Sequence, residues 1–372
     1  MTGDRIRLKA FLEQSEEFLE SARTQFPDAA KLTIPDVLMQ EPRPLTPVWI
    51  DNPDSPTREE RRQIEDDFFG PNGVAHFAYA GERSKKTDRH QLFALAEQLN
   101  GRLPLAHAVD HPMEQHPQAR MRFGPSDGTL KIYNLPIPLE VDKYREVAES
   151  KELFAAHNDG LGYAGAVSAA MLVLDSAPAW GGYTCFQQFI RLAIALANSD
   201  ARAFRALFTP DAIVAVRPRG KGAIRVASPV LYVNDHGHPQ TFFRIGSGEY
   251  QISWRKDLPA LNQARELLVR LAQPFAPSST FVHMMHPGQG VLIRNPQVIH
   301  SRTAFEDDVY GTQRVLARKW FVASAADSAY KHVPGMNVHP RYSRLYPEYF
   351  APEYLSGEWH FDQSAGRNVR IG

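Results

Sequence analysis

Apolar residues lie at helical spacing in several parts of the chain. Residues 5–24 place isoleucine, leucine and phenylalanine among charged side chains in a pattern that suits an amphipathic helix. A second helix is predicted to begin after Thr57, a residue able to cap it, and to end before Gly70. The same reasoning predicts further helices at 90–99, 186–197, 201–207 and 258–271.

From Leu130 onward, short apolar runs alternate with turn residues, which is typical of strands. The polar turn at 234–237 between two such runs predicts a β-hairpin. Short strands with a few helices favour a mainly β fold with flanking helices, built on a double-stranded β-helix core of the jelly-roll, cupin-like kind. The predicted strands are 74–80, 131–135, 166–174, 230–233, 241–245, 280–284, 290–293 and 314–323.

These elements divide the chain into three parts. Residues 1–60 form an N-terminal helix and a Pro-rich extension, of which 27–56 is expected to run extended over the surface. Residues 61–330 form the main β domain with helical insertions. Residues 331–372 are rich in Pro, Tyr and Arg with weak periodicity, so we expect a surface tail. The sequence therefore predicts one principal domain.

Composition narrows the class of partner. Lys plus Arg and Asp plus Glu both number 42, so there is no net positive charge to attract nucleic acid or an anionic membrane, and a small-molecule partner is favoured. Cys185 is the only cysteine, which excludes an intramolecular disulfide. No signal peptide is visible and no apolar run approaches the roughly 20 residues of a membrane span. We therefore expect a cytoplasmic protein, and a homo-oligomer is left open.

The candidate chemistry lies in two segments far apart in the chain, His157-Asn158-Asp159 and His300. Two imidazoles and one carboxylate on one face of a metal leave three positions open, as in non-haem Fe(II) oxygenases. Residues i and i+2 of an extended segment point the same way, so His157 and Asp159 can face one cavity. Taken alone, however, a His-x-Asp tripeptide more often has an ordinary structural role.

The surrounding segments add a resemblance to a known family. Gly-Gly-Tyr-Thr at 181–184, the segment 295–305 around the distal histidine and the segment 313–320 resemble the taurine dioxygenase/clavaminate synthase family. The order of the motifs also agrees with that family, and they cover residues 157–320. This resemblance implies an Fe(II)- and 2-oxoglutarate-dependent dioxygenase.

The resemblance also implies roles for individual residues. His157, Asp159 and His300 would bind Fe(II), with O2 and 2-oxoglutarate as co-substrates. Arg314, 14 residues after the second histidine, would pair with the distal carboxylate of 2-oxoglutarate, and Thr184 would hydrogen-bond the same group. Four residues on, Arg318 would reach an acidic group of the substrate. From its position shortly after His300, Arg302 is expected to hold the local loop or a neighbouring carboxylate rather than the substrate.

The implied reaction is hydroxylation, or another oxidation, of an unactivated C–H bond in a small carboxylate-bearing or amino-acid-like substrate, with release of succinate and CO2. The carboxylate of Asp159 argues against halogenation, because related halogenases carry a small residue there. Two alternatives are kept. One is a non-catalytic β-barrel binding module, whose signature would be loss of a ligand, and the other is a zinc-dependent hydrolase on the same ligands, which would not need Thr184 and Arg314.

Overall fold

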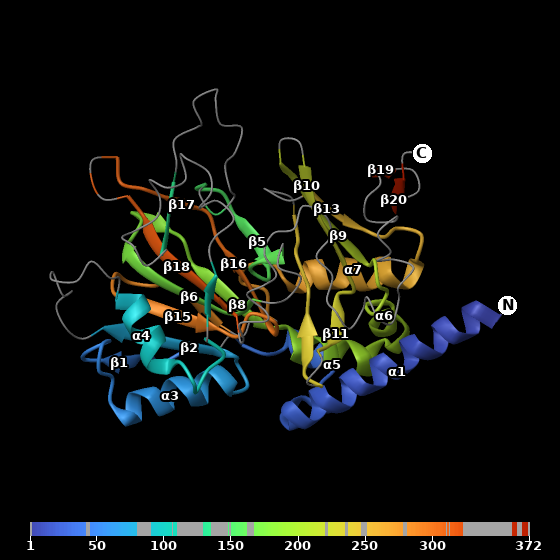
Figure 1. Ribbon diagram of the computed structural model, residues 1–372, viewed down its shortest axis with the longest axis horizontal. Helices are drawn as coiled ribbons and strands as arrows, with labels where there is room; N and C mark the ends of the chain where they lie inside the picture. The colour runs from blue at the N-terminus through green and yellow to red at the C-terminus, as the bar shows by residue number, and fades with distance from the viewer. Residues whose placement is uncertain are drawn as a thin grey trace.

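Two β-sheets packed against one another form the centre of the computed structural model of the chain (Figure 1). The residues that it describes are 2–41, 45–79, 91–105, 107–109, 129–134, 148, 150–161, 167–219, 222–234, 237–246, 251–277, 281–309, 311, 313–322, 359–362 and 367–370.

The larger sheet has the spatial order β1 (Val48–Ile50), β2 (Val74–Tyr79), β15 (Gln289–Ile293), β6 (Val167–Ser176), β18 (Val315–Val322) and β3 (His107–Val109), and β4 (Leu130–Tyr133) also pairs with β18. The smaller sheet has the order β14 (Phe281–His283), β8 (Thr184–Gln188), β16 (Val298–Arg302) and β5 (Phe154–His157). All of these pairs are antiparallel except β1 with β2.

Shorter pairings surround these two sheets. They are β10 (Gly222–Ser228), β9 (Ile213–Arg219) and β13 (Gln251–Trp254) in that order, β11 (Leu231–Val233) with β12 (Pro239–Thr241), β7 (Trp180–Gly181) with β17 (Phe305–Glu306), and β19 (Trp359–Asp362) with β20 (Arg367–Arg370). The β11–β12 pair confirms the predicted hairpin. Of the tail predicted at 331–372, only β19 and β20 lie among the described residues.

The helices lie on two sides of the sheets (Figure 1). They are α1 (Thr2–Gln25), η1 (Pro27–Ala29), α2 (Ile34–Leu38), α3 (Arg58–Phe69), α4 (Gln91–Leu99), α5 (Phe189–Ser199), α6 (Ala201–Ala206) and α7 (Pro259–Leu271). The fold is thus mainly β with flanking helices, as predicted. Within the described part of the chain, none of the helices is both long and apolar enough to cross a membrane.

The core between the two sheets draws on both of them. Phe186 and Phe281 of the smaller sheet stack with ring centroids 4.6 Å apart and pack with Leu172, Val291 and Leu316 of the larger sheet. The outer face of the larger sheet packs against α3 and α4 in a separate cluster, and α1, α5, α6 and α7 enclose a third. The alternation of side chains along each strand thus separates an inner layer from an outer one.

The helix predictions hold where the signals are local. Helix α3 begins after Thr57, whose hydroxyl accepts a hydrogen bond from the Glu60 amide while the Glu60 carboxylate accepts one from the Thr57 amide. This capping box satisfies two amides that the first turn of a helix leaves without partners. The helix predicted to begin at 186 instead begins at Phe189, because residues 184–188 belong to β8.

Two predictions from the pattern are wrong. Segment 27–56 does not run extended over the surface, because it forms η1, α2 and β1 and buries Ile34, Val37 and Ile50. Two of its prolines, Pro27 and Pro35, stand in the first turn of η1 and of α2, where a missing amide hydrogen costs nothing. The strand expected at 241–245 ends at Thr241, because the main chain of Phe243 bonds to Asn158 rather than to a neighbouring strand.

A buried histidine between the sheets gives the fold a dependence on pH. His76 on β2 is 1% exposed, its Nδ1 lies 3.3 Å from the Leu45 carbonyl oxygen, and its ring centroid lies 4.2 Å from that of His283. Burial, with a smaller contribution from His283, lowers the pKa of His76 to about 4. Between pH 4 and 6.5 the His76 imidazole is therefore protonated in the unfolded chain and neutral in the folded chain.

We expect this histidine to make the protein less stable in acid. The contribution of neutral, buried His76 to the free energy of unfolding is fully present above the unfolded pKa of about 6.5. As the pH drops from there through 4, the free energy of unfolding falls by about 3 kcal/mol. Urea unfolding of wild type and His76→Gln between pH 4.5 and 7.5 isolates the effect, because every other group titrates in both proteins. Parallel stability curves for the two proteins would contradict it.

Candidate metal and co-substrate site

Two neighbouring strands of the smaller sheet bring the predicted histidines together. In the antiparallel register of β5 and β16, His157 lies directly opposite His300, and their ring centroids are 4.4 Å apart. Directly opposed residues project from the same face of a sheet, so both imidazoles point to the space between the two sheets. Asp159 follows two residues after His157, where β5 has ended.

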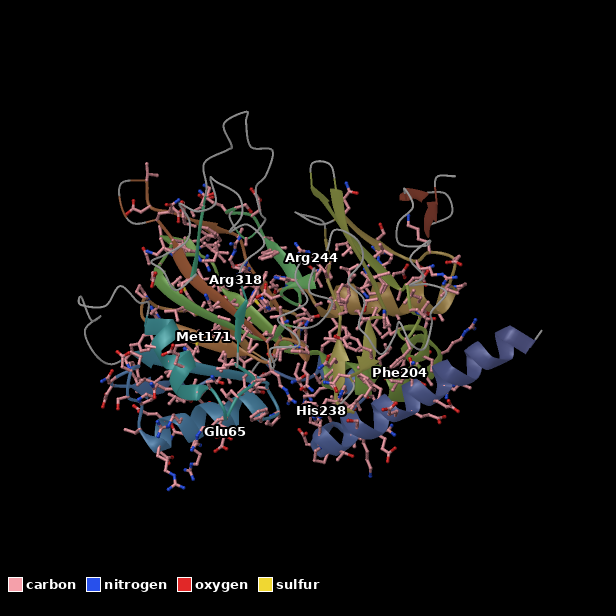
Figure 2. The ribbon with its side chains drawn as sticks, viewed as in Figure 1. Glu65, Met171, Phe204, His238, Arg244 and Arg318 are labelled. Atoms are coloured by element: carbon pink, nitrogen blue, oxygen red, sulfur yellow. The ribbon has the colours of Figure 1, made fainter. Side chains whose placement is uncertain are left out.

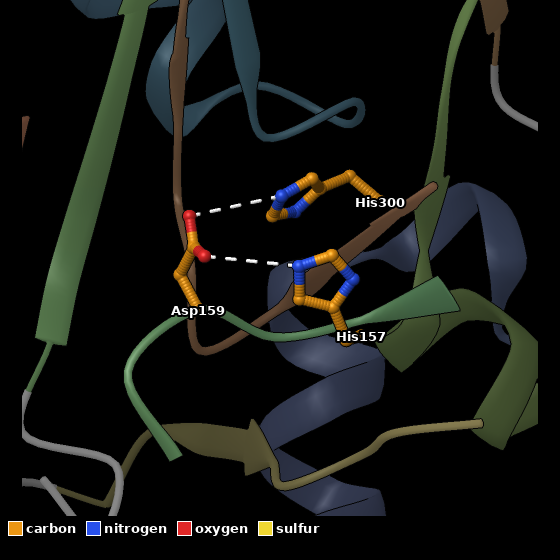
Figure 3. A group of neighbouring side chains, drawn as sticks. All are labelled: His157, Asp159 and His300. Carbon is orange, nitrogen blue, oxygen red and sulfur yellow. Dashed lines mark ion pairs between the residues drawn. The ribbon is translucent and has the colours of Figure 1, made fainter. Parts of the chain in front are cut away.

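The three side chains converge on one point (Figure 3). The Asp159 carboxylate lies beside the two rings and faces both, with Oδ1 3.7 Å from His157 Nε2 and Oδ2 3.7 Å from His300 Nε2. All three side chains are buried. Across the described ranges they are the only group of three His, Cys, Asp or Glu side chains able to share a metal ion.

The atoms that face each other fit a metal ion. His157 Nδ1 donates to the Ala155 carbonyl oxygen at 2.8 Å, which leaves the lone pair of Nε2 directed toward Asp159. His157 Nε2 and Asp159 Oδ2 are both buried without a hydrogen-bond partner. Such groups are costly to bury unless something satisfies them, and separations of 3.7 Å are too long for hydrogen bonds. A cation at the common centre would satisfy these atoms.

The protonation states of the site also suit a metal. Burial alone would raise the pKa of the Asp159 carboxyl, but Arg318, His300 and His157 together hold that pKa well below its usual range. Burial, together with the neighbouring His157, lowers the pKa of His300 to about 3. The carboxyl is therefore anionic and the His300 ring neutral at physiological pH, which are the forms that bind a metal.

A cavity opens beside these three side chains and extends between the sheets. It contains about 430 Å³ of empty space, including its open mouth. Its lining residues are Ile132, Ala148, Phe154, Asp159, Leu172, Thr184, His300, Ser301, Arg302, Arg314, Leu316 and Arg318. The predicted residues therefore line one cavity with the exception of His157, whose ring packs against that of Phe154 at 4.0 Å.

Arg314 and Thr184 line this cavity together. Arg314 is 2% exposed and stands just before β18, held there by its amide, which donates to Asp307 Oδ1 at 2.8 Å. Its guanidinium lies 5.1 Å from the ring centre of Phe305, and its Nε is buried without a partner. Burial lowers the pKa of Arg314 to about 10, against the opposing effect of Asp307, so the group stays charged at neutral pH.

The predicted Gly-Gly-Tyr-Thr element lies against Arg314. Gly182 has a φ of +78°, and a Cβ placed on it would lie 3.5 Å from Arg314 Nε. Gly181 has a φ of +74° and has no room for a side chain, since a Cβ there would lie 2.3 Å from the Ala304 carbonyl oxygen. The two glycines let the chain turn into β8 close to the arginine, so that Thr184 begins the strand on the cavity wall.

Arg302 has the structural role expected from the sequence. Its guanidinium donates to the carbonyl oxygens of Ala148 at 3.2 Å, Ser150 at 2.8 Å and Glu152, and its Nε donates to that of Thr303 at 3.2 Å. These bonds attach the segment around residue 150 to the end of β16. That segment includes part of the cavity wall, so Arg302 shapes the site without being available to a ligand.

Two further arginines, Arg318 and Arg244 (both labelled in Figure 2), lie close to Asp159 and His157. Arg318 Nη1 lies 3.4 Å from Asp159 Oδ1, and its guanidinium lies 4.3 Å from the ring centre of Trp320. Arg244 forms a β-bridge with His157, so both side chains project from the same face, and its guanidinium lies 5.5 Å from the ring centre of Phe154. Sequence reasoning missed Arg244, although a lone charge in the apolar run 242–245 is a signal for it.

Comparison with known proteins identifies one sequence family and several similar folds. Residues 99–320 match the family described as Taurine catabolism dioxygenase TauD, TfdA family. No curated protein matches the chain.

Among solved structures, the non-heme iron oxygenase OrfP in complex with Fe and alpha-ketoglutaric acid is 13% identical, covering 73% of this chain and 82% of that chain with a TM-score of 0.50. Asparagine oxygenase in complex with Fe(II), 2S,3S-3-hydroxyasparagine and succinate is 15% identical, covering 82% and 91%, with a TM-score of 0.48. PvcB from Pseudomonas aeruginosa is 17% identical, covering 67% and 75%, with a TM-score of 0.42. At 13% identity the likeness to OrfP concerns the fold alone.

Proposed function

Because this chain belongs to the TauD/TfdA family of dioxygenases, we propose that it hydroxylates, or otherwise oxidises, an unactivated C–H bond of a small carboxylate-bearing or amino-acid-like substrate. It is a non-haem iron dioxygenase that uses Fe(II) and 2-oxoglutarate. The observation that carries the proposal is the group His157, Asp159 and His300, of which Asp159 and His300 line the same cavity as Arg314.

In this proposal each residue has one task. His157, Asp159 and His300 hold Fe(II), which, when bound, supplies the O2-dependent oxidising chemistry that converts 2-oxoglutarate to succinate and CO2. The Arg314 guanidinium grips the distal carboxylate of 2-oxoglutarate with two parallel hydrogen bonds, and the Thr184 hydroxyl adds a third. Burial of both residues excludes water, which strengthens these contacts.

We also propose an architecture for the catalytic domain. The two packed sheets form a double-stranded β-helix, within a single catalytic domain whose helical parts surround the barrel. Because the cavity lies between the sheets, its apolar walls shield the reacting C–H bond from solvent. The alternatives of a binding module and a zinc hydrolase gain no support among the described residues, where all three ligands and the Thr184–Arg314 pair are present.

Anaerobic titration of the Fe(II)-loaded protein with 2-oxoglutarate tests the proposal. A keto acid chelated by iron at a two-histidine, one-carboxylate site gives a weak visible charge-transfer band, which we expect to grow and saturate. With metal and co-substrate established, screening carboxylates and amino acids for succinate release would identify the substrate. If iron binds and no band develops, the co-substrate site proposed at Arg314 is wrong.

We expect Arg318→Ala to uncouple the two halves of the reaction. In the proposal this arginine holds the acidic group of the substrate, so its loss should leave 2-oxoglutarate consumption while substrate oxidation falls. Iron affinity should not fall, because the substitution removes a positive charge 3.4 Å from Asp159. Succinate and oxidised product are measured together, with the best substrate of the screen. If Arg318→Ala impairs only 2-oxoglutarate binding, the arginine has been given the wrong role.

A further inference from the structure

One buried side chain bonds both main-chain polar groups of a proposed metal ligand. Asn295 lies just before β16 and is 2% exposed. Its Oδ1 accepts a hydrogen bond from the Asp159 amide at 2.7 Å, and its Nδ2 donates to the Asp159 carbonyl oxygen at 3.0 Å. The same Nδ2 also donates to the Val167 carbonyl oxygen at 2.9 Å. Asp159 is thus held where no strand pairing holds it.

A second buried amide connects the two ligand segments. Asn158, between His157 and Asp159, donates from Nδ2 to the carbonyl oxygens of Asn295 at 2.6 Å and Val298 at 3.2 Å. Val298 begins β16, the strand that carries His300. Asn158 also makes two hydrogen bonds of 2.9 Å with the main chain of Phe243. The Phe243 main-chain N–H donates to Asn158 Oδ1, and the Asn158 main-chain N–H donates to the Phe243 carbonyl oxygen. The histidine and carboxylate of one segment are therefore tied to the strand that holds the other histidine.

We propose that Asn295 and Asn158 are positioning residues that fix the three metal ligands in their binding geometry before the metal arrives. This inference rests on the metal ligands proposed above. The separations of 3.7 Å from Asp159 to each imidazole are those of groups that could share one cation. Side chains that support metal ligands in this way raise affinity because the ligands need no reorganisation on binding.

The chain offers a matched control two residues further on. Gln297 is also buried and also carries an amide, but it donates to the Pro239 carbonyl oxygen at 3.0 Å and contacts Gln25 on α1. None of these partners is a metal ligand. Removing the Gln297 amide thus costs buried hydrogen bonds in the same region without releasing Asp159.

The test is a titration of the metal-free proteins with Co(II), followed by its visible d–d bands. For Asn295→Ala we expect the Kd to rise about 10- to 100-fold and the band shape to change, and for Asn158→Ala a change in the same direction. Gln297→Ala should lower the melting temperature while its Kd and spectrum remain those of wild type. An unchanged Kd in Asn295→Ala would overturn the positioning role, and an absence of Co(II) binding by wild type would overturn the metal site itself.

Hydrogen exchange of wild type supplies a measurement that does not depend on a variant folding. If Asn295 holds Asp159 in advance, the Asp159 amide is protected in the metal-free protein and gains little when Co(II) is added. Exchange at the rate of an open loop without metal, followed by protection on Co(II) addition, would show that the metal and not Asn295 orders this segment.

Discussion

Replacing His300 by alanine will abolish iron binding and turnover together. In the proposed site its Nε2 is one of three ligand atoms, and His157 and Asp159 alone would fill only two of the three positions on that face of the ion. The loss should exceed the roughly 10- to 100-fold that removal of an outer partner costs. His157→Ala should behave alike. Metal content after anaerobic loading and succinate release with 2-oxoglutarate measure the two effects.

The control for this substitution is His283→Ala. His283 lies on β14 of the same sheet and faces the same interior, but its ring contacts His76 and its Nε2 lies 3.2 Å from Gln289 Oε1 rather than near the metal ligands. We expect this variant to lose some stability and to keep its iron. Full activity in either His300→Ala or His157→Ala would rule out the three-ligand site.

Arg314→Ala will raise the KM for 2-oxoglutarate with little change in iron affinity. Hydrogen bonds to a charged group contribute about 1.5–3 kcal/mol each, so losing a bidentate pair should cost about 3–6 kcal/mol and raise KM by roughly two to four orders of magnitude. Iron affinity should hold, because Arg314 contacts Asp307 and Phe305 rather than the proposed metal ligands. Initial rates over a range of 2-oxoglutarate concentrations give KM.

Arg314→Lys separates charge from geometry in this experiment. A lysine keeps the positive charge and loses the planar fork, so its KM should fall between those of wild type and Arg314→Ala. Fe(II) titration of all three proteins provides the control. A KM for 2-oxoglutarate that does not change in Arg314→Ala would place the co-substrate elsewhere in the cavity.

The parts of the site that sequence could predict are those carried by short motifs. The His-x-Asp spacing places His157 and Asp159 together because the residues are two apart, and helix α3 follows from Thr57 and Glu60 in one turn. Strand β16 was not predicted, although it carries His300. Only Val298 and Ile299 of its five residues favour a strand on their own, and the whole segment is extended because β8 and β5 pair with it on both sides.

Arg244 and Asn295 were missed for the same reason. Each acts through contacts with residues distant in the chain, Arg244 opposite His157 and Asn295 around Asp159. The strand predicted at 241–245 was wrong for the same reason, because the main-chain N–H and C=O of Phe243 both form hydrogen bonds with Asn158. Tertiary contacts determine these conformations and roles, and the periodicity of a short stretch of sequence does not predict them.

The direct opposition of His157 and His300 has a consequence for how the protein folds. A slip of one residue between β5 and β16 would send one imidazole to the other face of the sheet, so the ion can be captured only by a correctly registered ladder. These strands are also far apart in the chain, and pairings of that kind form late. Metal capture is therefore a signal that folding is complete. During refolding, Co(II) bands should appear after the helical signal and never before it.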